Sequence, residues 1–134
     1  MATPHILIVE DHEVTGELMR RHLDTIASVT VEDGVAPAIE RVDMVESPFD
    51  LCIIDIHLGG EEDGVVLLNK LRTRPDYEDV PMLACTAHAL PGDKEKYLAA
   101  GFDAYLAKPF VRKDFQTKVQ DLMSSPVADP TDSA

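Results

Sequence analysis

The chain alternates between short continuous apolar runs and longer segments in which apolar residues recur every three or four positions. Continuous runs are typical of strands buried on both faces, and the wider spacing is typical of helices with one buried face. We therefore predict strands at residues 5–9, 28–32, 49–54, 80–86 and 104–107. We predict helices at residues 13–25, 35–45, 64–71, 92–100 and 111–122.

The helix predictions rest on apolar stripes and on residues that start or stop a helix. In the first predicted helix Val14, Leu18, His22 and Ile26 fall at helical spacing, and we expect this stripe to be buried. The second would be capped by Asp33 or Gly34, and Gly101 would stop the fourth. Five strand–helix units in a row predict an α/β fold, a parallel sheet with helices on both faces.

Length and composition fit one domain with an ordinary core. We assign residues 1–123 to that domain and expect residues 124–134, a segment rich in Pro, Ser and Asp, to be a disordered tail. The net charge is −13, from 25 acidic and 12 basic residues. This balance argues against binding nucleic acid or an anionic membrane surface, since both require many Lys and Arg residues.

The chain carries no sign of export or membrane insertion. Its apolar runs are too short to cross a bilayer, and its first residues lack the features of a signal peptide. Cys52 and Cys85 lie inside strand-like runs without metal-ligand spacing. We interpret them as buried free thiols and expect a cytoplasmic location.

Unusual polar residues stand where the predicted strands end. Glu10 and Asp11 follow the first strand, Asp55 ends the third, Thr86 ends the fourth, and Lys108 follows the fifth. In open parallel sheets, sites form at the carboxyl ends of the strands. The predicted fold would therefore bring three carboxylates, a hydroxyl and an ammonium group to one edge.

This combination of groups suits phosphoryl chemistry at a carboxylate. Three neighbouring carboxylates repel one another, and a hard divalent cation such as Mg²⁺ removes the conflict. Lys108 and Thr86 would contact an anion bound beside the metal. A carboxylate can itself accept a phosphoryl group as an acyl phosphate, and the remaining groups then position it and neutralise charge.

Together these motifs resemble the receiver domains of two-component response regulators, over residues 5–123. The resemblance is carried by residues 6–11 (ILIVED), residues 51–55 (LCIID), Thr86-Ala87 and residues 108–110 (KPF). It implies a flavodoxin-like (βα)5 fold with strand order 2-1-3-4-5. The loop after Asp55 departs from the commonest pattern, since it is one residue longer and lacks a Pro at position 59. Similar loops are found in receivers attached to hybrid histidine kinases.

The resemblance also implies residue roles. Asp55 would be the phosphoacceptor. Mg²⁺, or Mn²⁺ in its place, would be held by Asp11, Asp55 and the backbone carbonyl of His57, with Glu10 acting through a water. Lys108 would pair with the phosphoryl group. Thr86 would move toward it, and Tyr105 would turn inward in response. The resemblance implies two further features. His57, Ala87 and His88 would modulate the lifetime of the acyl phosphate. The peptide bond between Lys108 and Pro109 would be cis.

The implied partners are proteins. A histidine kinase or histidine phosphotransfer protein would donate the phosphoryl group, and a downstream target would recognise the surface of the fourth helix, fifth strand and fifth helix, residues 94–115. We expect self-phosphorylation and autodephosphorylation but no other enzymatic activity.

Three alternatives stay open on the sequence. A haloacid-dehalogenase type phosphatase requires a second Asp two residues after its nucleophile, where this chain has His57. A binding module of the same fold would act without phosphate, which the intact set of site residues argues against. The chain could also be a receiver excised from a hybrid kinase; its first residue, Met1, favours a free-standing protein.

Overall fold

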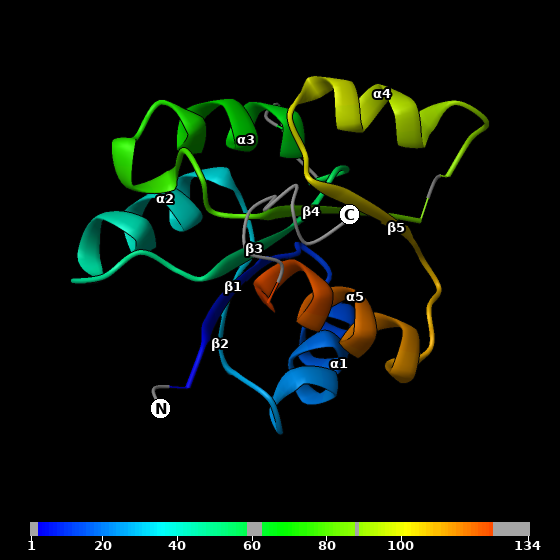
Figure 1. Ribbon diagram of the computed structural model, residues 1–134, viewed down its shortest axis with the longest axis horizontal. Helices are drawn as coiled ribbons and strands as arrows, with labels where there is room; N and C mark the ends of the chain where they lie inside the picture. The colour runs from blue at the N-terminus through cyan, green and yellow to red at the C-terminus, as the bar shows by residue number, and fades with distance from the viewer. Residues whose placement is uncertain (1–2, 59–62, 88, 125–134) are drawn as a thin grey trace, which may run out of the picture.

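The computed structural model describes residues 3–58, 63–87 and 89–124 and has the predicted parallel sheet (Figure 1). Its five strands lie in the order β2-β1-β3-β4-β5, and every neighbouring pair is parallel. The strands are β1 (His5–Val9), β2 (Ser28–Glu32), β3 (Leu51–Asp55), β4 (Met82–Thr86) and β5 (Ala104–Ala107). The helices are α1 (Glu13–Leu23), α2 (Val35–Met44), α3 (Gly64–Arg72), the 3₁₀ turn η1 (Pro75–Tyr77), α4 (Asp93–Ala100) and α5 (Arg112–Ser124).

Helices cover both faces of the sheet, as the sequence predicts. Figure 1 shows α1 and α5 on one side and α2, α3 and α4 on the other. Because side chains alternate across a strand, Ile6 and Ile8 pack with the α1–α5 layer, while Leu7 and Val9 pack with the opposite layer. Each layer therefore has its own apolar core, and the central strand β3 is buried along its whole length.

The buried face of α1 differs from the predicted one. Val14 is 72% exposed and Leu18 is 52% exposed, whereas Gly16, Met19 and Leu23 face the sheet. The helix carries two apolar stripes, and spacing alone does not tell which one meets the strands. Gly16, which has no Cβ, lies on the side of α1 that packs closely against β2. A Cβ at this position would lie 3.2 Å from Val31 Cγ1.

The C-terminal boundary moves by one residue. Ser124, assigned to the tail from the sequence, closes α5, and residues 125–134 lie outside the described residues. Within the described ranges, no helix has both the length and the apolar character to cross a membrane.

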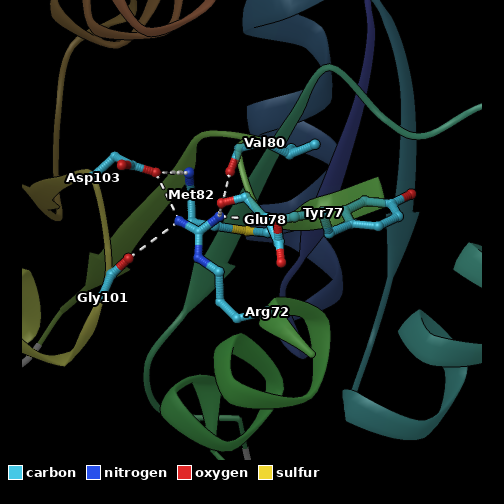
Figure 2. Close-up of polar contacts among 7 residues, drawn as sticks. All are labelled: Arg72, Tyr77, Glu78, Val80, Met82, Gly101 and Asp103. Carbon is cyan, nitrogen blue, oxygen red and sulfur yellow. Dashed lines mark hydrogen bonds and ion pairs between the residues drawn. The ribbon is translucent and has the colours of Figure 1, made fainter. Parts of the chain in front are cut away.

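Arg72, at the end of α3, links two loops at the amino edge of the sheet (Figure 2). Its guanidinium donates to the carbonyls of Tyr77, Glu78 and Val80 at 2.8–3.0 Å, and to the carbonyl of Gly101 at 3.2 Å. It also pairs with Asp103 Oδ2 at 2.9 Å, an oxygen that accepts from the Met82 amide as well. One side chain thus fastens the link before β4 to the link between α4 and β5.

Candidate functional site

The strand order brings the predicted site residues together at the carboxyl edge of the sheet. The order reverses between β1 and β3, and such a switch point is where open α/β sheets form their sites. Glu10 follows β1, Asp55 closes β3, Thr86 closes β4, and Lys108 follows β5. Residues that are far apart in the chain are therefore adjacent at this edge.

Three carboxylates form a compact donor set. Glu10, Asp11 and Asp55 each offer an oxygen, and these oxygens lie within 4.8 Å of one another. Glu10 and Asp55 are buried, while Asp11 is exposed, so the set opens to solvent on one side. Hard oxygen donors at this spacing fit a divalent cation such as Mg²⁺.

Lys108 lies against the two buried carboxylates. Its Nζ donates a hydrogen bond to Glu10 Oε1 and lies 3.3 Å from Asp55 Oδ2. Burial alone would lower the pKa of Lys108, but these two carboxylates raise it, so the side chain is a charged ammonium. Burial raises the pKa of Glu10, and the bond to Lys108 offsets part of that effect.

Backbone groups fix these side chains in place. The His57 amide donates to Asp55 Oδ1 at 3.1 Å, and the His12 amide donates to Glu10 Oε2 at 3.1 Å. The Lys108 amide donates to the Thr86 carbonyl at 2.8 Å, and the Lys108–Pro109 peptide bond is cis, as predicted. Asp55 is thus held through both of its carboxylate oxygens.

Gly64, which the sequence analysis did not single out, lets α3 begin directly behind Asp55. Its amide donates to the Ile56 carbonyl at 2.9 Å. A Cβ at this position would overlap the backbone oxygen of Asp55 and lie 2.9 Å from Ile54 Cγ2. Asp63 caps the helix by accepting from the amides of Val65 and Val66. The signal in the sequence was a glycine placed directly after a capping residue.

Thr86 and Tyr105 lie on the same face of the sheet. Tyr105 pairs in register with Ala84, two residues before Thr86, and Thr86 is fully buried. The Tyr105 ring stacks on Tyr97 of α4, with ring centres 6.1 Å apart and planes 13° apart. Its hydroxyl is covered and has no hydrogen-bond partner within the described part of the chain.

Three further positions, His57, Ala87 and His88, were predicted to modulate the site. The side chains of His57 and Ala87 are exposed, and His88 lies outside the described residues. Metal ligation by the His57 carbonyl and an inward turn of Tyr105 stay predictions, as do the roles of His57, Ala87 and His88 in setting the acyl phosphate lifetime.

Comparison with known proteins places the chain in a family. The model of the response regulator receiver domain matches residues 6–120. The solved receiver domain of the sensor histidine kinase PA1611 from Pseudomonas aeruginosa, with magnesium coordinated in its active site cleft, is 32% identical with a TM-score of 0.79. The match covers 91% of this chain and 98% of that one.

Relatives of two kinds match in sequence. The polar-differentiation response regulator DivK of Brucella ovis is 31% identical over 108 residues, which are 80% of this chain and 85% of DivK. The histidine-protein kinase BarA of Escherichia coli strain K12 is 35% identical over 105 residues, which are 78% of this chain but 11% of BarA. The chain belongs to the response regulator receiver domain family.

Proposed function

We propose that the chain accepts a phosphoryl group on Asp55 and signals through the resulting change of shape. The observation that carries this proposal is the state of the Asp55 carboxylate. It is buried, it is held by the His57 amide at one oxygen and by Lys108 at the other, and it shares a donor set with Glu10 and Asp11. This arrangement suits a nucleophile that must be positioned and have its charge neutralised.

Phosphoryl transfer would come from a phosphohistidine on a kinase or phosphotransfer protein. An Asp55 oxygen forms a bond to phosphorus while the bond from phosphorus to the imidazole nitrogen breaks, and that nitrogen keeps the electron pair. The ammonium of Lys108 follows the negative charge onto the phosphoryl oxygens, and the Thr86 hydroxyl donates to one of them. Apart from self-phosphorylation and autodephosphorylation, we propose no enzymatic activity.

A divalent cation belongs to this proposal. Asp11 and Asp55 would ligate it, with Glu10 acting through a water and the His57 carbonyl completing the set. When bound, Mg²⁺ neutralises charge on the phosphoryl oxygens. The magnesium in the PA1611 receiver supports this choice, and Mn²⁺, with similar oxygen preference, would substitute.

The proposed output surface comprises α4, β5 and α5. Exposed apolar side chains on and beside these elements support it: Leu90 is 66% exposed and Val111 is 62% exposed. Apolar side chains that gather on one surface mark protein-binding sites. The acidic charge makes a nucleic acid or an anionic membrane an unsuitable target, and a cytoplasmic location, where histidine kinases present their phosphoryl groups, is part of the proposal.

Incubation with acetyl phosphate and Mg²⁺, followed by intact mass measurement, tests the proposal. We expect one added phosphoryl group, lost on chelation of the metal and absent from Asp55→Asn. Asp79→Asn, which removes an exposed acid on the link before β4, at the opposite edge of the sheet, serves as the matched control and should be phosphorylated normally. Unreduced phosphorylation of Asp55→Asn would exclude Asp55 as the acceptor.

Partner binding separates this function from a phosphate-independent module. A partner that binds phosphorylated wild type more tightly than Asp55→Asn supports the proposal. Equal binding to both would favour the module instead.

A further inference from the structure

The attachment of α4 to the rest of the molecule depends on very few side chains. Tyr97 is its one buried residue, at 6% exposure, and its ring contacts Tyr105 face to face and Phe102 edge to face. The helix lies over β5 at one edge of the sheet (Figure 1). Tyr97 is therefore the contact through which α4 meets the core.

The two ends of α4 are held differently. At its C-terminal end, the carbonyl of Gly101 and the carboxylate of Asp103 are both bound by Arg72 (Figure 2). At its N-terminal end, Gly92 has a positive φ of 88°, and a Cβ there would meet nothing within 4 Å. A displacement of the helix would therefore swing the N-terminal end and leave the C-terminal end in place.

Opposing contributions act on the Tyr105 ring. Its covered hydroxyl, which has no hydrogen-bond partner among the described residues, disfavours the observed orientation by a factor of roughly five or more, as a buried unpaired polar group does. Stacking on Tyr97 favours it by a factor of roughly two to ten. Because the two contributions oppose each other, a local change in either one shifts the balance between ring orientations.

From these contacts we propose that Tyr97 is a positioning residue, which ties the orientation of the Tyr105 ring to the placement of α4. The inference rests on the proposed function, since a phosphoryl group on Asp55 supplies the change that acts through Thr86 on Tyr105. Rotation of the Tyr105 ring removes the support under Tyr97. The helix then pivots about the end that Arg72 holds, and the exposed surface around Leu90 moves with its N-terminal end.

The chain offers a direct spectroscopic test, because it has three Tyr residues and no Trp. Protein labelled with 3-fluorotyrosine should give one ¹⁹F signal each for Tyr77, Tyr97 and Tyr105, assigned by single Tyr→Phe substitutions. On addition of acetyl phosphate and Mg²⁺, we expect the signals of Tyr97 and Tyr105 to shift together and that of Tyr77 to stay. A shift of Tyr105 alone would overturn the proposal.

Variants of Tyr97 test the stack without any phosphodonor. In Tyr97→Leu the Tyr105 signal should move in the same direction as it does in wild type on addition of acetyl phosphate and Mg²⁺, by an amount that corresponds to a shift of about two- to tenfold in the ring equilibrium. Tyr97→Phe keeps the ring and should leave the Tyr105 signal in place. Tyr77→Leu is the matched control, since Tyr77 is equally buried, at 3%, but lies on η1 away from α4.

Hydrogen exchange completes the test on α4 itself. Exchange at the N-terminal end of the helix should accelerate in Tyr97→Leu but not in Tyr77→Leu, and exchange near Gly101 should change less. If Tyr97→Leu leaves the Tyr105 signal and α4 exchange unchanged, the proposal is wrong. That result is distinct from a failure of the proposed function, which would appear as no gain of mass with acetyl phosphate.

Discussion

At the scale of single residues, Lys108 is the positive charge that balances two buried carboxylates. Its side chain is 13% exposed, and those of Glu10 and Asp55 are 2% and 8% exposed. A buried charge without its partner is costly, because neither water nor a counter-charge solvates it. The ammonium that we propose for phosphoryl transfer therefore also keeps the resting site stable.

We predict that Lys108→Met, measured by urea unfolding at neutral pH without metal, loses about 3 kcal/mol of unfolding free energy. Glu10→Gln combined with Lys108→Met should recover much of the loss, since one unpaired charge is removed. Lys113→Met, at an exposed position of α5, should change the free energy by less than about 0.5 kcal/mol. Equal losses in the single and double variants would contradict the proposed charge balance.

His22, at the interface of α1 and α5, links stability to pH. Burial and then Arg112 lower its pKa below the ordinary value of 6.5, and its ring packs edge to face on Phe115. A lowered pKa in the folded state means that the unfolded chain binds the proton more readily. The stabilisation is therefore present above pH 6.5 and is lost as the pH falls toward the pKa of the folded state.

We predict that wild type loses more stability than His22→Gln between about pH 7.5 and about pH 5.5. Urea midpoints of both proteins across this range would measure the difference. His12→Gln, which replaces an exposed imidazole, is the control variant. Parallel curves for wild type and His22→Gln would show that the interface does not disfavour the imidazolium.

At the scale of elements, the start of α3 is fitted to the end of β3. No side chain separates Gly64 from the backbone of Asp55, so the helix start and the carboxylate form one rigid unit. Any Cβ at this position must displace either the start of α3 or the end of β3. The glycine is thus required by close approach and not by a left-handed backbone.

We predict that Gly64→Ala lowers the unfolding free energy by about 2–4 kcal/mol, as severe overpacking does, and slows phosphorylation by acetyl phosphate. Gly34→Ala provides the comparison, because a Cβ there meets one atom, Pro37 Cδ, at an ordinary 3.6 Å. Gly34 is the N-cap of α2, so alanine there should cost no more than about 1 kcal/mol, well below the loss at Gly64. Normal stability of Gly64→Ala would mean that α3 shifts at little cost.

The Arg72 clamp joins α3, η1 and the link between α4 and β5. Lysine keeps the charge but presents its donors at a single point, so it cannot reach acceptors in both loops. We predict a loss of about 1–2 kcal/mol for Arg72→Lys, since partly buried carbonyls lose their donor. Thermal and urea unfolding would measure it.

The control for the clamp is Arg21→Lys, because the Arg21 side chain is 71% exposed and makes one ion pair with Glu17. Its stability should stay within about 0.5 kcal/mol of wild type. A similarly small effect of Arg72→Lys would show that the carbonyls find other donors.

At the scale of the whole molecule, the net charge of −13 opposes folding through self-repulsion. At physiological ionic strength the Debye length is about 8 Å, so salt screens surface charges but has little effect within the buried donor set. A divalent cation would act on both, since it screens charge and, in the proposed function, also binds the folded state at Glu10, Asp11 and Asp55.

We predict that MgCl₂ raises the melting temperature more than NaCl at the same ionic strength. Magnesium at about 100 times its Kd would add about 2.7 kcal/mol to the unfolding free energy. Asp11→Asn should lose the difference between the two salts, whereas Asp79→Asn, at the opposite edge of the sheet, should keep it. If MgCl₂ and NaCl stabilise wild type equally, the donor set does not bind the metal in the folded protein.

The sequence by itself determined the sheet and the membership of the site. The runs at residues 6–9 and 51–54 are short and continuously apolar, which predicts buried strands, and the polar residues that follow them meet at the carboxyl edge, because parallel strands end together. The local pattern was sufficient, because whether a segment forms a buried strand depends mainly on the polarity of a few neighbouring residues. Even the strands at the edges of the sheet, β2 and β5, have the bounds that were predicted.

Only the tertiary structure decided which surfaces meet. It selected Met19 over Leu18 as the buried side of α1 and placed Gly64 against the Asp55 backbone. It also set Tyr97 on Tyr105 and closed the Arg72 clamp across 31 residues to Asp103. These contacts depend on how closely helices and strands pack against one another. The spacing of apolar residues along the chain does not specify that packing distance.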